Sequence, residues 1–224
     1  MLGAIAIMPS APVLVPELAG AAAVELAELR AAVTAAAGFL PSHWVAVGAG
    51  AADAVFGPEN AGTFAGFGVD LAVRLSPRVD RVADLPLCAL IAGWVRDRVR
   101  PEAYVQVQVC SDPEGAFERG ERLRAEIDRS PEPTGVLVLA DGANTLTRIA
   151  PGGYRPDDVD VQAALDDALV HGDTAALTGL PTQVVGRSAF AMLAGLAGPA
   201  PRTAEELYRG APYGVGYFVG VWRS

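Results

Sequence analysis

Short apolar runs alternate with segments of helical periodicity along most of this chain, and this alternation predicts its secondary structure. Residues 53–68 hold four glycines and a proline and predict a loop or an irregular hairpin, and residues 141–156 predict a long polar loop. Runs rich in Val, Ile and Leu predict buried strands at 2–8, 44–47, 69–75, 103–110, 135–139 and 214–222. Apolar spacing and capping residues predict helices at 17–37, 85–99, 111–128, 158–170, 181–196 and 203–209.

Strands that alternate with helices indicate crossover connections, which join parallel strands. The strand at 103–110 should bury Val105, Val107 and Val109 on one face, because side chains alternate along a strand. No internal repeat, charge run or linker divides the sequence. We therefore expect one α/β domain over residues 1–224, with a largely parallel central sheet flanked by helices.

Composition narrows the class of protein. The chain is 51% hydrophobic and 19% charged, which is enough apolar surface for a core and excludes global disorder. Its formal net charge of −9 and its scattered arginines argue against a nucleic-acid partner. The apolar N-terminus has no positive residues before it is interrupted by Pro9, Pro12 and Pro16, so neither a signal peptide nor a membrane anchor is expected. We expect a cytoplasmic protein.

Three predicted strands end in short loops of small and polar residues: 9–12, 48–50 and 140–144. Ligands of open α/β sheets bind beyond the carboxyl ends of the strands, so these loops are the candidate site. The third loop begins the segment with the most polar and charged side chains. Within eight residues it holds Asp141, Asn144, Thr145, Thr147 and Arg148. An alternative interpretation is that Asp141 and Asn144 only satisfy the backbone of a turn.

The residue types that usually carry catalysis are scarce. His43 precedes a strand and should lie at the opposite edge of the sheet, and His171 is placed to end a helix, so both are interpreted as structural. The sequence from Gly48 to Asp53 resembles a dinucleotide-binding turn, but the charge of Asp53 and the following Gly- and Pro-rich stretch disfavour that function. Cys88 and Cys110 are interpreted as buried, reduced thiols.

The segment 211–222 places glycines inside a predicted strand, which often marks a close approach of backbone or ligand. Tyr213 or Tyr217 could line a cleft there, and packing in the core or at an edge is the alternative.

These loops, in this order, resemble those of the class III extradiol ring-cleavage dioxygenases, specifically the LigB-like superfamily and its actinobacterial branch. The opening sequence from Ile7 to Leu18 is similar to the family's first strand and loop, written PHPPxLxPE. Segments 64–70, 85–87, 138–144 and 211–222 also have counterparts, so the resemblance covers nearly the whole chain. It implies a LigB-like α/β fold.

The resemblance also implies what an intact member would contain: iron(II) held by two histidines and a carboxylate, and a further histidine as acid–base catalyst. In this sequence the family's histidine positions fall on Ser10, on Gly50 or a neighbour, and on Asn144, while the aspartate is kept as Asp141. A hydroxyl, a glycine and an amide are poor substitutes for imidazole ligands, and Asn144 cannot transfer a proton near neutral pH. We therefore predict no bound cofactor.

Three hypotheses follow. The first is a LigB-like protein without the metal-binding and catalytic histidines, which binds a small molecule or a protein partner and is not an enzyme. The second is an enzyme of altered, metal-independent chemistry, with Asp141 as base if burial raises its pKa, Asn144 and Arg148 as further catalytic residues, and Arg148 orienting a carboxylate or phosphate. The third keeps dioxygenase-like or other metal chemistry with ligands from Asp53, Asp112, Asp141 or a second chain. A homo-oligomer is compatible with all three. Candidate cleft residues are Ser10, Gly50, Asp53, Thr145, Thr147 and Tyr213.

Overall fold

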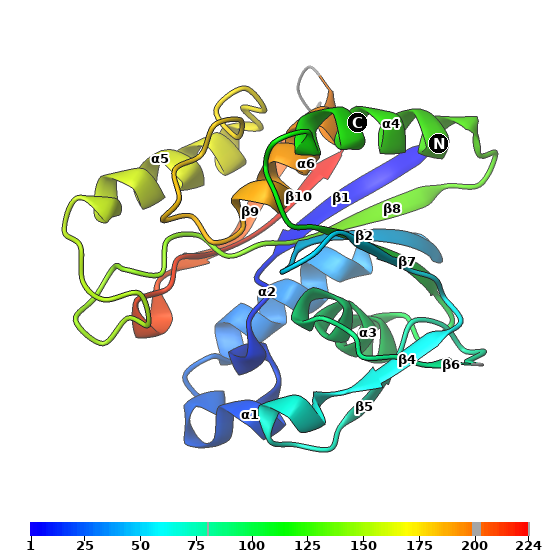
Figure 1. Ribbon diagram of the computed structural model, residues 1–224, viewed down its shortest axis with the longest axis horizontal. Coiled ribbons are helices and arrows are strands. Elements are labelled where there is room, and N and C mark those ends of the chain that lie inside the picture. The colour runs from blue at the N-terminus through cyan, green and yellow to red at the C-terminus, as the bar shows by residue number, and fades with distance from the viewer. Residues whose placement is uncertain (80, 199–202, 224) are drawn as a thin grey trace.

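A seven-stranded mixed sheet forms the centre of the protein in the computed structural model, which describes residues 1–79, 81–198 and 203–223 (Figure 1). The strand order is β3-β7-β2-β8-β1-β10-β9. The strands of this sheet are β1 (Leu2–Met8), β2 (His43–Ala49), β3 (Ala54–Phe56), β7 (Tyr104–Cys110), β8 (Thr134–Leu139), β9 (Thr203–Gly210) and β10 (Tyr217–Arg223). The expected single α/β domain is confirmed.

The parallel part of the sheet is its core. β7, β2, β8 and β1 run parallel to one another, whereas β3, β10 and β9 pair antiparallel at the two edges. The prediction of a largely parallel sheet is therefore correct for the four central strands and too broad for the edges. In this order β2, β8 and β1 are neighbours, so the three loops singled out in the sequence lie side by side, with the loop after β8 in the middle.

Helices cover both faces of the sheet. α4 and α6 pack on one face with α5 beside them, and α2 and α3 pack on the other (Figure 1). Val105, Val107 and Val109 all face the α2–α3 layer, as the alternation in β7 predicts. The α-helices of the described residues are α1 (Pro16–Ala19), α2 (Ala27–Gly38), α3 (Leu87–Val99), α4 (Ala116–Arg129), α5 (Asp158–His171) and α6 (Arg187–Ala197).

One predicted helix is interrupted and another is wrong. Residues 17–37 do not form one helix: α1 ends at Ala19, because Gly20 has a φ of 56° outside the helical region, and α2 begins only at Ala27. Residues 203–209 form the edge strand β9, because their backbone pairs with β10 from Thr203 to Gly210. Local sequence favoured a helix there, and the pairing of the sheet overrides that preference.

The segment 53–75 also differs from its prediction. It contributes the edge strand β3 to the main sheet and then enters a small sheet of order β5-β4-β6, made of β4 (Asn60–Thr63), β5 (Ala72–Arg74) and β6 (Arg81–Val82). The strand expected at 69–75 is thus only three residues long and lies outside the main sheet. It pairs with β4 across an intervening 3-10 turn, which short local patterns do not reveal.

Several boundaries move by a few residues. α4 starts at Ala116 because Gly115 has a φ of 75°, and Asp112 Oδ1 instead accepts a hydrogen bond from the Glu114 backbone N–H at 2.9 Å. α6 starts at Arg187, six residues later than expected. β10 starts at Tyr217, because residues 212–214 form a short 3-10 turn.

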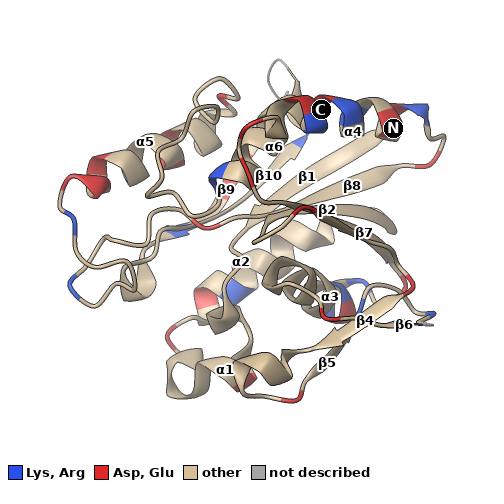
Figure 2. Ribbon diagram, viewed as in Figure 1, with Lys and Arg blue, Asp and Glu red and all other residues tan. Residues whose placement is uncertain are grey.

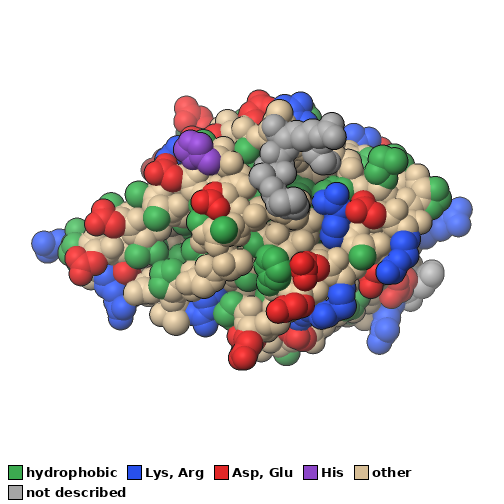
Figure 3. Space-filling view, turned by 90° about the horizontal axis from the view of Figure 1, so that it is seen from above, with side chains coloured by type: hydrophobic (Ala, Val, Ile, Leu, Met, Phe, Trp, Pro, Cys, Tyr) green, Lys and Arg blue, Asp and Glu red, His purple; other side chains and the backbone are tan. Residues whose placement is uncertain are grey.

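Charged side chains of both signs are distributed over the surface. Figure 2 shows that α5 carries acidic but no basic residues, whereas α4 carries both. On the face seen from above in Figure 3, basic and acidic side chains are interspersed. Within residues 1–79, 81–198 and 203–223, no helix is long and apolar enough to cross a membrane.

Candidate functional site

Asp141 occupies the centre of the carboxyl edge of the sheet, two residues after the end of β8. Its Oδ1 accepts a hydrogen bond at 2.9 Å from the backbone N–H of Ser10, which follows the neighbouring strand β1. The structure therefore brings together two candidate residues that are 131 positions apart in the sequence. Their contact depends on β1 and β8 being parallel neighbours, which brings the loops after both strands to the same edge.

The loop that carries Asp141 is fixed by backbone hydrogen bonds on both sides. Gly186 N–H donates to the Asp141 carbonyl at 2.8 Å, and Gly142 N–H donates to the Gly216 carbonyl at 2.8 Å. Gly216 N–H in turn donates to the Ala143 carbonyl at 2.8 Å. The loop is thus tied to the start of α6 and to the entry of β10, which holds the carboxylate in one place.

Desolvation dominates the electrostatics of Asp141. Loss of hydration disfavours the charged form and raises the pKa of this carboxyl to about 7, although the Ser10 N–H stabilises the carboxylate. Burial therefore raises the pKa of Asp141, as the hypothesis of a general base requires. Burial also raises the pKa of Tyr217, and the nearby Asp141 charge raises it further. Tyr217 is 4% exposed and packs in the core against the α2–α3 layer.

The other candidate residues of this loop contact α5, the loop itself or solvent. Thr145 Oγ1 donates to Asp158 Oδ2 at 2.6 Å and ties the loop to the first residue of α5. Asn144 accepts the Gly152 N–H on its carbonyl at 2.9 Å, and its side chain packs against Gly152. Arg148 is exposed on the loop surface. Among the described residues, no hydrogen bond or ion pair joins Asn144 or Arg148 to the Asp141 carboxyl.

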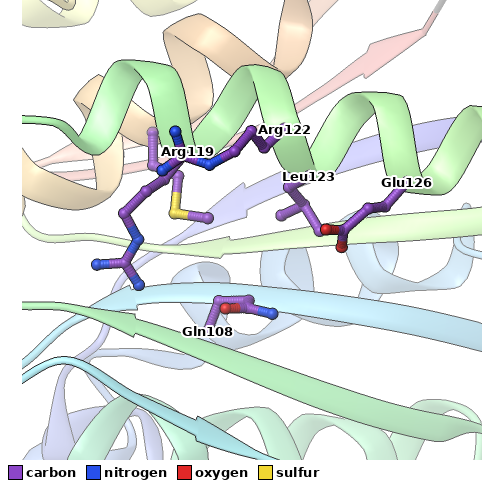
Figure 4. Close-up of a pocket in the computed structure, with 6 residues that line it drawn as sticks. Gln108, Arg119, Arg122, Leu123 and Glu126 are labelled. Carbon is purple, nitrogen blue, oxygen red and sulfur yellow. The ribbon is translucent and has the colours of Figure 1, made fainter.

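Asp53 belongs to a separate polar cluster at the end of β7. Its Oδ1 accepts from the Ser111 N–H at 2.8 Å and from Ser111 Oγ at 2.9 Å, and its Oδ2 pairs with Arg119 Nη1 at 2.6 Å. These hydrogen bonds, the Ser111 backbone bond first, lower the pKa of Asp53 to about 2. Arg119 also contributes to a hollow of about 160 Å³ between α4 and β7, with Leu123 and Glu126 on α4 and Gln108 across it on β7 (Figure 4).

The glycines after β2 are explained by packing. A Cβ at Gly48 would lie 2.4 Å from Cys88 Cβ, and a Cβ at Gly50 would lie 2.4 Å from Val109 Cγ1. Gly50 N–H donates to the Cys110 carbonyl at 3.2 Å. These close approaches to α3 and β7 explain why glycine occupies both positions, and a phosphate-binding turn is not needed to explain them. Cys88 and Cys110 are free and buried, as expected.

The two histidines lie where the sequence placed them. His43 is the first residue of β2, at the amino edge of the sheet, where it stacks on Tyr104 and lies 3.3 Å from Glu132. His171 is the last residue of α5, and its Nδ1 lies 2.8 Å from the Asp167 carbonyl. Across residues 1–79, 81–198 and 203–223 no group of three or more His, Cys, Asp and Glu side chains is arranged to hold a metal ion.

The tyrosine in the turn before β10 has an unusual backbone. Tyr213 has a φ of 59°, and its hydroxyl donates to Glu25 Oε2 at 2.7 Å. It therefore bridges this turn to the segment before α2. Sequence reasoning had no signal for this partner, which is 188 residues away. The glycines around it allow close packing of side chains: a Cβ at Gly214 would meet Thr147 Oγ1, and one at Gly216 would meet Gln162 Oε1.

A pocket of about 500 Å³ lies between α5 and β9, and no local pattern in the sequence indicates it. We call it the α5–β9 pocket. Thr147 is the one candidate residue that lines it, and Gln162 connects it to the Asp141 loop by accepting the Ala143 N–H at 2.8 Å. Its remaining lining residues come from segments that the sequence alone does not place together. The lining residues are Leu146, Thr147, Val159, Gln162, Ala163, Asp166, Arg209, Gly210 and Ala211.

Comparisons with known proteins identify the fold. No protein-family model and no curated protein matches this chain. A solved structure, "uncharacterized protein JW3007 from Escherichia coli K12", is similar over 99% of this chain and 100% of its own, with a TM-score of 0.57 and 11% sequence identity. This likeness confirms the α/β fold and carries no information about activity.

Proposed function

We propose that this chain is a small-molecule-binding protein of LigB-like fold, in which the Asp141 carboxyl at the carboxyl edge of the sheet recognises a hydrogen-bond donor of the ligand. The observation that carries the proposal is the position of Asp141. It is a desolvated carboxyl held by Ser10 N–H at 2.9 Å, in the middle of the edge where α/β sheets bind ligands.

The surroundings of Asp141 favour recognition by this group. The loop is held from two sides by backbone hydrogen bonds, so binding requires little ordering of the protein. Ser10 N–H satisfies one oxygen of the carboxyl, and a carboxylate can accept about four hydrogen bonds in all. A ligand donor such as a hydroxyl, an amide N–H or an ammonium group would stabilise the charged form that burial disfavours.

The iron centre that the resemblance implies does not fit the residues at this edge. Gly50 offers no ligand atom on a side chain, and Val109 Cγ1 fills the space where a Cβ would lie. Asn144 packs its side chain against Gly152, and Ser10 contacts Asp141 through its backbone N–H. Hydroxyl and amide groups are weak ligands for iron(II) compared with imidazole. We therefore derive no step that involves a metal.

Fragment screening by NMR tests the proposal. A set of small polar fragments is added to uniformly 15N-labelled protein at about pH 7.5, above the pKa of about 7 of Asp141. We expect binding fragments to shift the amide resonances of Ser10, Gly142 and Ala143. The variant Asp141→Asn should weaken those fragments by about tenfold, which corresponds to about 1.4 kcal/mol for one hydrogen bond to a charged group.

A matched control separates recognition from a general loss of charge. Asp53→Asn removes a carboxylate from the same edge of the sheet, and Asp53 is already paired with Arg119. Fragment affinity should change by less than about twofold in this variant, since surface ion pairs contribute little. Fragments that bind wild type and Asp141→Asn equally well would refute the role of Asp141.

The second candidate function is enzymatic, with Asp141 as general base. One observation favours it: a pKa of about 7 is suited to proton transfer near neutral pH. Fragments that bind are incubated with the protein in D₂O, and exchange of their carbon-bound protons is followed by NMR. Exchange that rises with pH through about 7 in wild type and is lost in Asp141→Asn would establish a base, whereas no exchange supports a binding protein.

A further inference from the structure

The α5–β9 pocket has apolar walls and one buried acid. Leu146, Val159, Ala163 and Ala211 supply apolar surface, and Val159, Gln162, Ala163 and Asp166 follow one another at helical spacing along one face of α5. Its volume of about 500 Å³ is in the range of small-molecule sites. Asp166 is 6% exposed and Gln162 is 7% exposed, so these two polar side chains are largely shielded from bulk water.

Asp166 is bound on one side by a neutral group. Gln162 Nε2 donates to Asp166 Oδ1 at 2.8 Å, while Gln162 Oε1 accepts from Ala143 N–H at 2.8 Å, which fixes the orientation of the amide. Burial raises the pKa of Asp166 to about 6. A buried carboxylate with a neutral partner retains a large part of its desolvation cost, and a cation beside it would offset that cost.

The cation nearest to this carboxyl already has partners. Arg209 Nη2 lies 2.7 Å from Glu206 Oε2, and its Nη1 lies 3.7 Å from Asp167 Oδ1. Two carboxylates, Asp167 and Glu206, and one guanidinium, Arg209, border Asp166, so this end of the pocket holds three acidic groups and one basic group. Ion pairing with Arg209 leaves an excess of negative charge at this end of the pocket.

A second polar atom at the wall has no partner. Thr147 Oγ1 is buried and makes no hydrogen bond within residues 1–79, 81–198 and 203–223. Thr147 lines the pocket from the loop after β8, and its hydroxyl oxygen is packed beside Gly214.

We propose that the α5–β9 pocket binds a small organic amine as its ammonium ion, with the charged head on Asp166 and the apolar body against Leu146, Val159 and Ala163. The ammonium ion donates to the free acceptor positions of Asp166 and adds positive charge where Arg209 alone leaves an excess of negative charge. The site is distinct from the Asp141 edge and does not depend on the function proposed there, although Gln162 contacts both.

Calorimetric titration with three matched probes tests the proposal. 2-Phenylethylamine, 2-phenylethanol and 3-phenylpropionate share an aromatic body and differ in the charge of the head group. We expect wild type at about pH 7.5 to bind the amine at least about tenfold more tightly than the alcohol, and to bind the carboxylate most weakly. Amide resonances of Ala163 and Gly210 should shift with the amine.

Three Asp→Asn variants test whether the Asp166 carboxylate binds the amine. Asp166→Asn keeps the shape of the side chain and an oxygen for Gln162, and should reduce amine affinity by about tenfold while leaving the alcohol unchanged. Asp160→Asn removes an exposed carboxylate from the same helix and should change amine affinity by less than about twofold. Asp141→Asn should also leave amine affinity unchanged, which separates this site from the Asp141 edge.

The pH dependence gives a further readout. Amine binding should weaken as pH falls through about 6, because protonation removes the charge of Asp166. Equal affinities of wild type for the amine and the alcohol would overturn the proposal. So would equal amine affinities of wild type and Asp166→Asn, or amide shifts confined to residues outside the pocket.

Discussion

Ionisation of Asp141 should oppose folding, and the variant Asp141→Asn should reveal by how much. The carboxyl has a pKa of about 7 in the folded protein against an ordinary value of 3.8. Between these two values the folded state binds more protons than the unfolded state, so this group contributes stability at low pH that is lost as pH rises through about 7. Asparagine can still accept the hydrogen bond of Ser10 N–H but does not ionise.

The magnitude follows from the two pKa values. Integrating proton release between about pH 4.5 and about pH 8.5 gives a loss of about 3 kcal/mol for wild type that the variant does not suffer. The unfolding free energies are measured by urea titration of both proteins at several pH values. We expect Asp141→Asn to become more stable relative to wild type by about 3 kcal/mol over this range.

Asp166 also titrates in this range, but it is present in both proteins and cancels in the comparison. Asp160→Asn, which removes an exposed carboxylate, is the control, and its stability relative to wild type should change by less than about 1 kcal/mol over this range. A stability difference between wild type and Asp141→Asn that stays constant with pH would refute the assigned desolvation of this carboxyl.

Three further predictions concern packing, an ion pair and a thiol. Gly120→Ala should destabilise the fold by about 1–3 kcal/mol in urea unfolding, because the new Cβ would lie 2.1 Å from the Met192 carbonyl oxygen. Gly38→Ala is the control and should be neutral or stabilising, because its Cβ would meet no atom within 4 Å. Arg119→Met should raise the pKa of Asp53 above about 2 in an NMR titration, but only part of the way to 3.8, because the Ser111 hydrogen bonds remain; an unchanged value would contradict the pairing. Cys88, whose thiol pKa burial raises to about 11, should react with a thiol reagent only on unfolding, and fast reaction in the native protein would contradict its burial.

The sequence predicts the parts of the fold that depend on local patterns of apolar and polar residues. The central strands and α3 and α5 are predicted within a few residues, since their apolar runs and their boundaries lie in continuous segments. The edge strand β9 is not, because Thr203–Gly210 becomes a strand only by pairing with β10. Gly20 likewise ends a helix in a stretch whose other residues favour one.

The candidate site is also predicted only in part, because local patterns locate its loops but not the contacts between distant segments. Three loops at strand ends can be located from the sequence, and the parallel order β2-β8-β1 places them together. The residues after Asp141 form a group only because they are close in sequence, yet Thr145 turns to Asp158 and Arg148 turns to solvent. The α5–β9 pocket needs α5, β9 and a loop to meet, and no local pattern encodes that meeting.

The amide resonance of Ser10, followed through a pH titration with and without the tightest fragment, tests the central role of Asp141 most directly. Ser10 N–H is bonded to Asp141 Oδ1, so its chemical shift should report the titration of the carboxyl with an inflection near pH 7 in the free protein. A ligand that donates to the carboxylate favours the charged form, and the inflection should move to lower pH. An inflection that stays in place at saturating fragment would contradict recognition by Asp141.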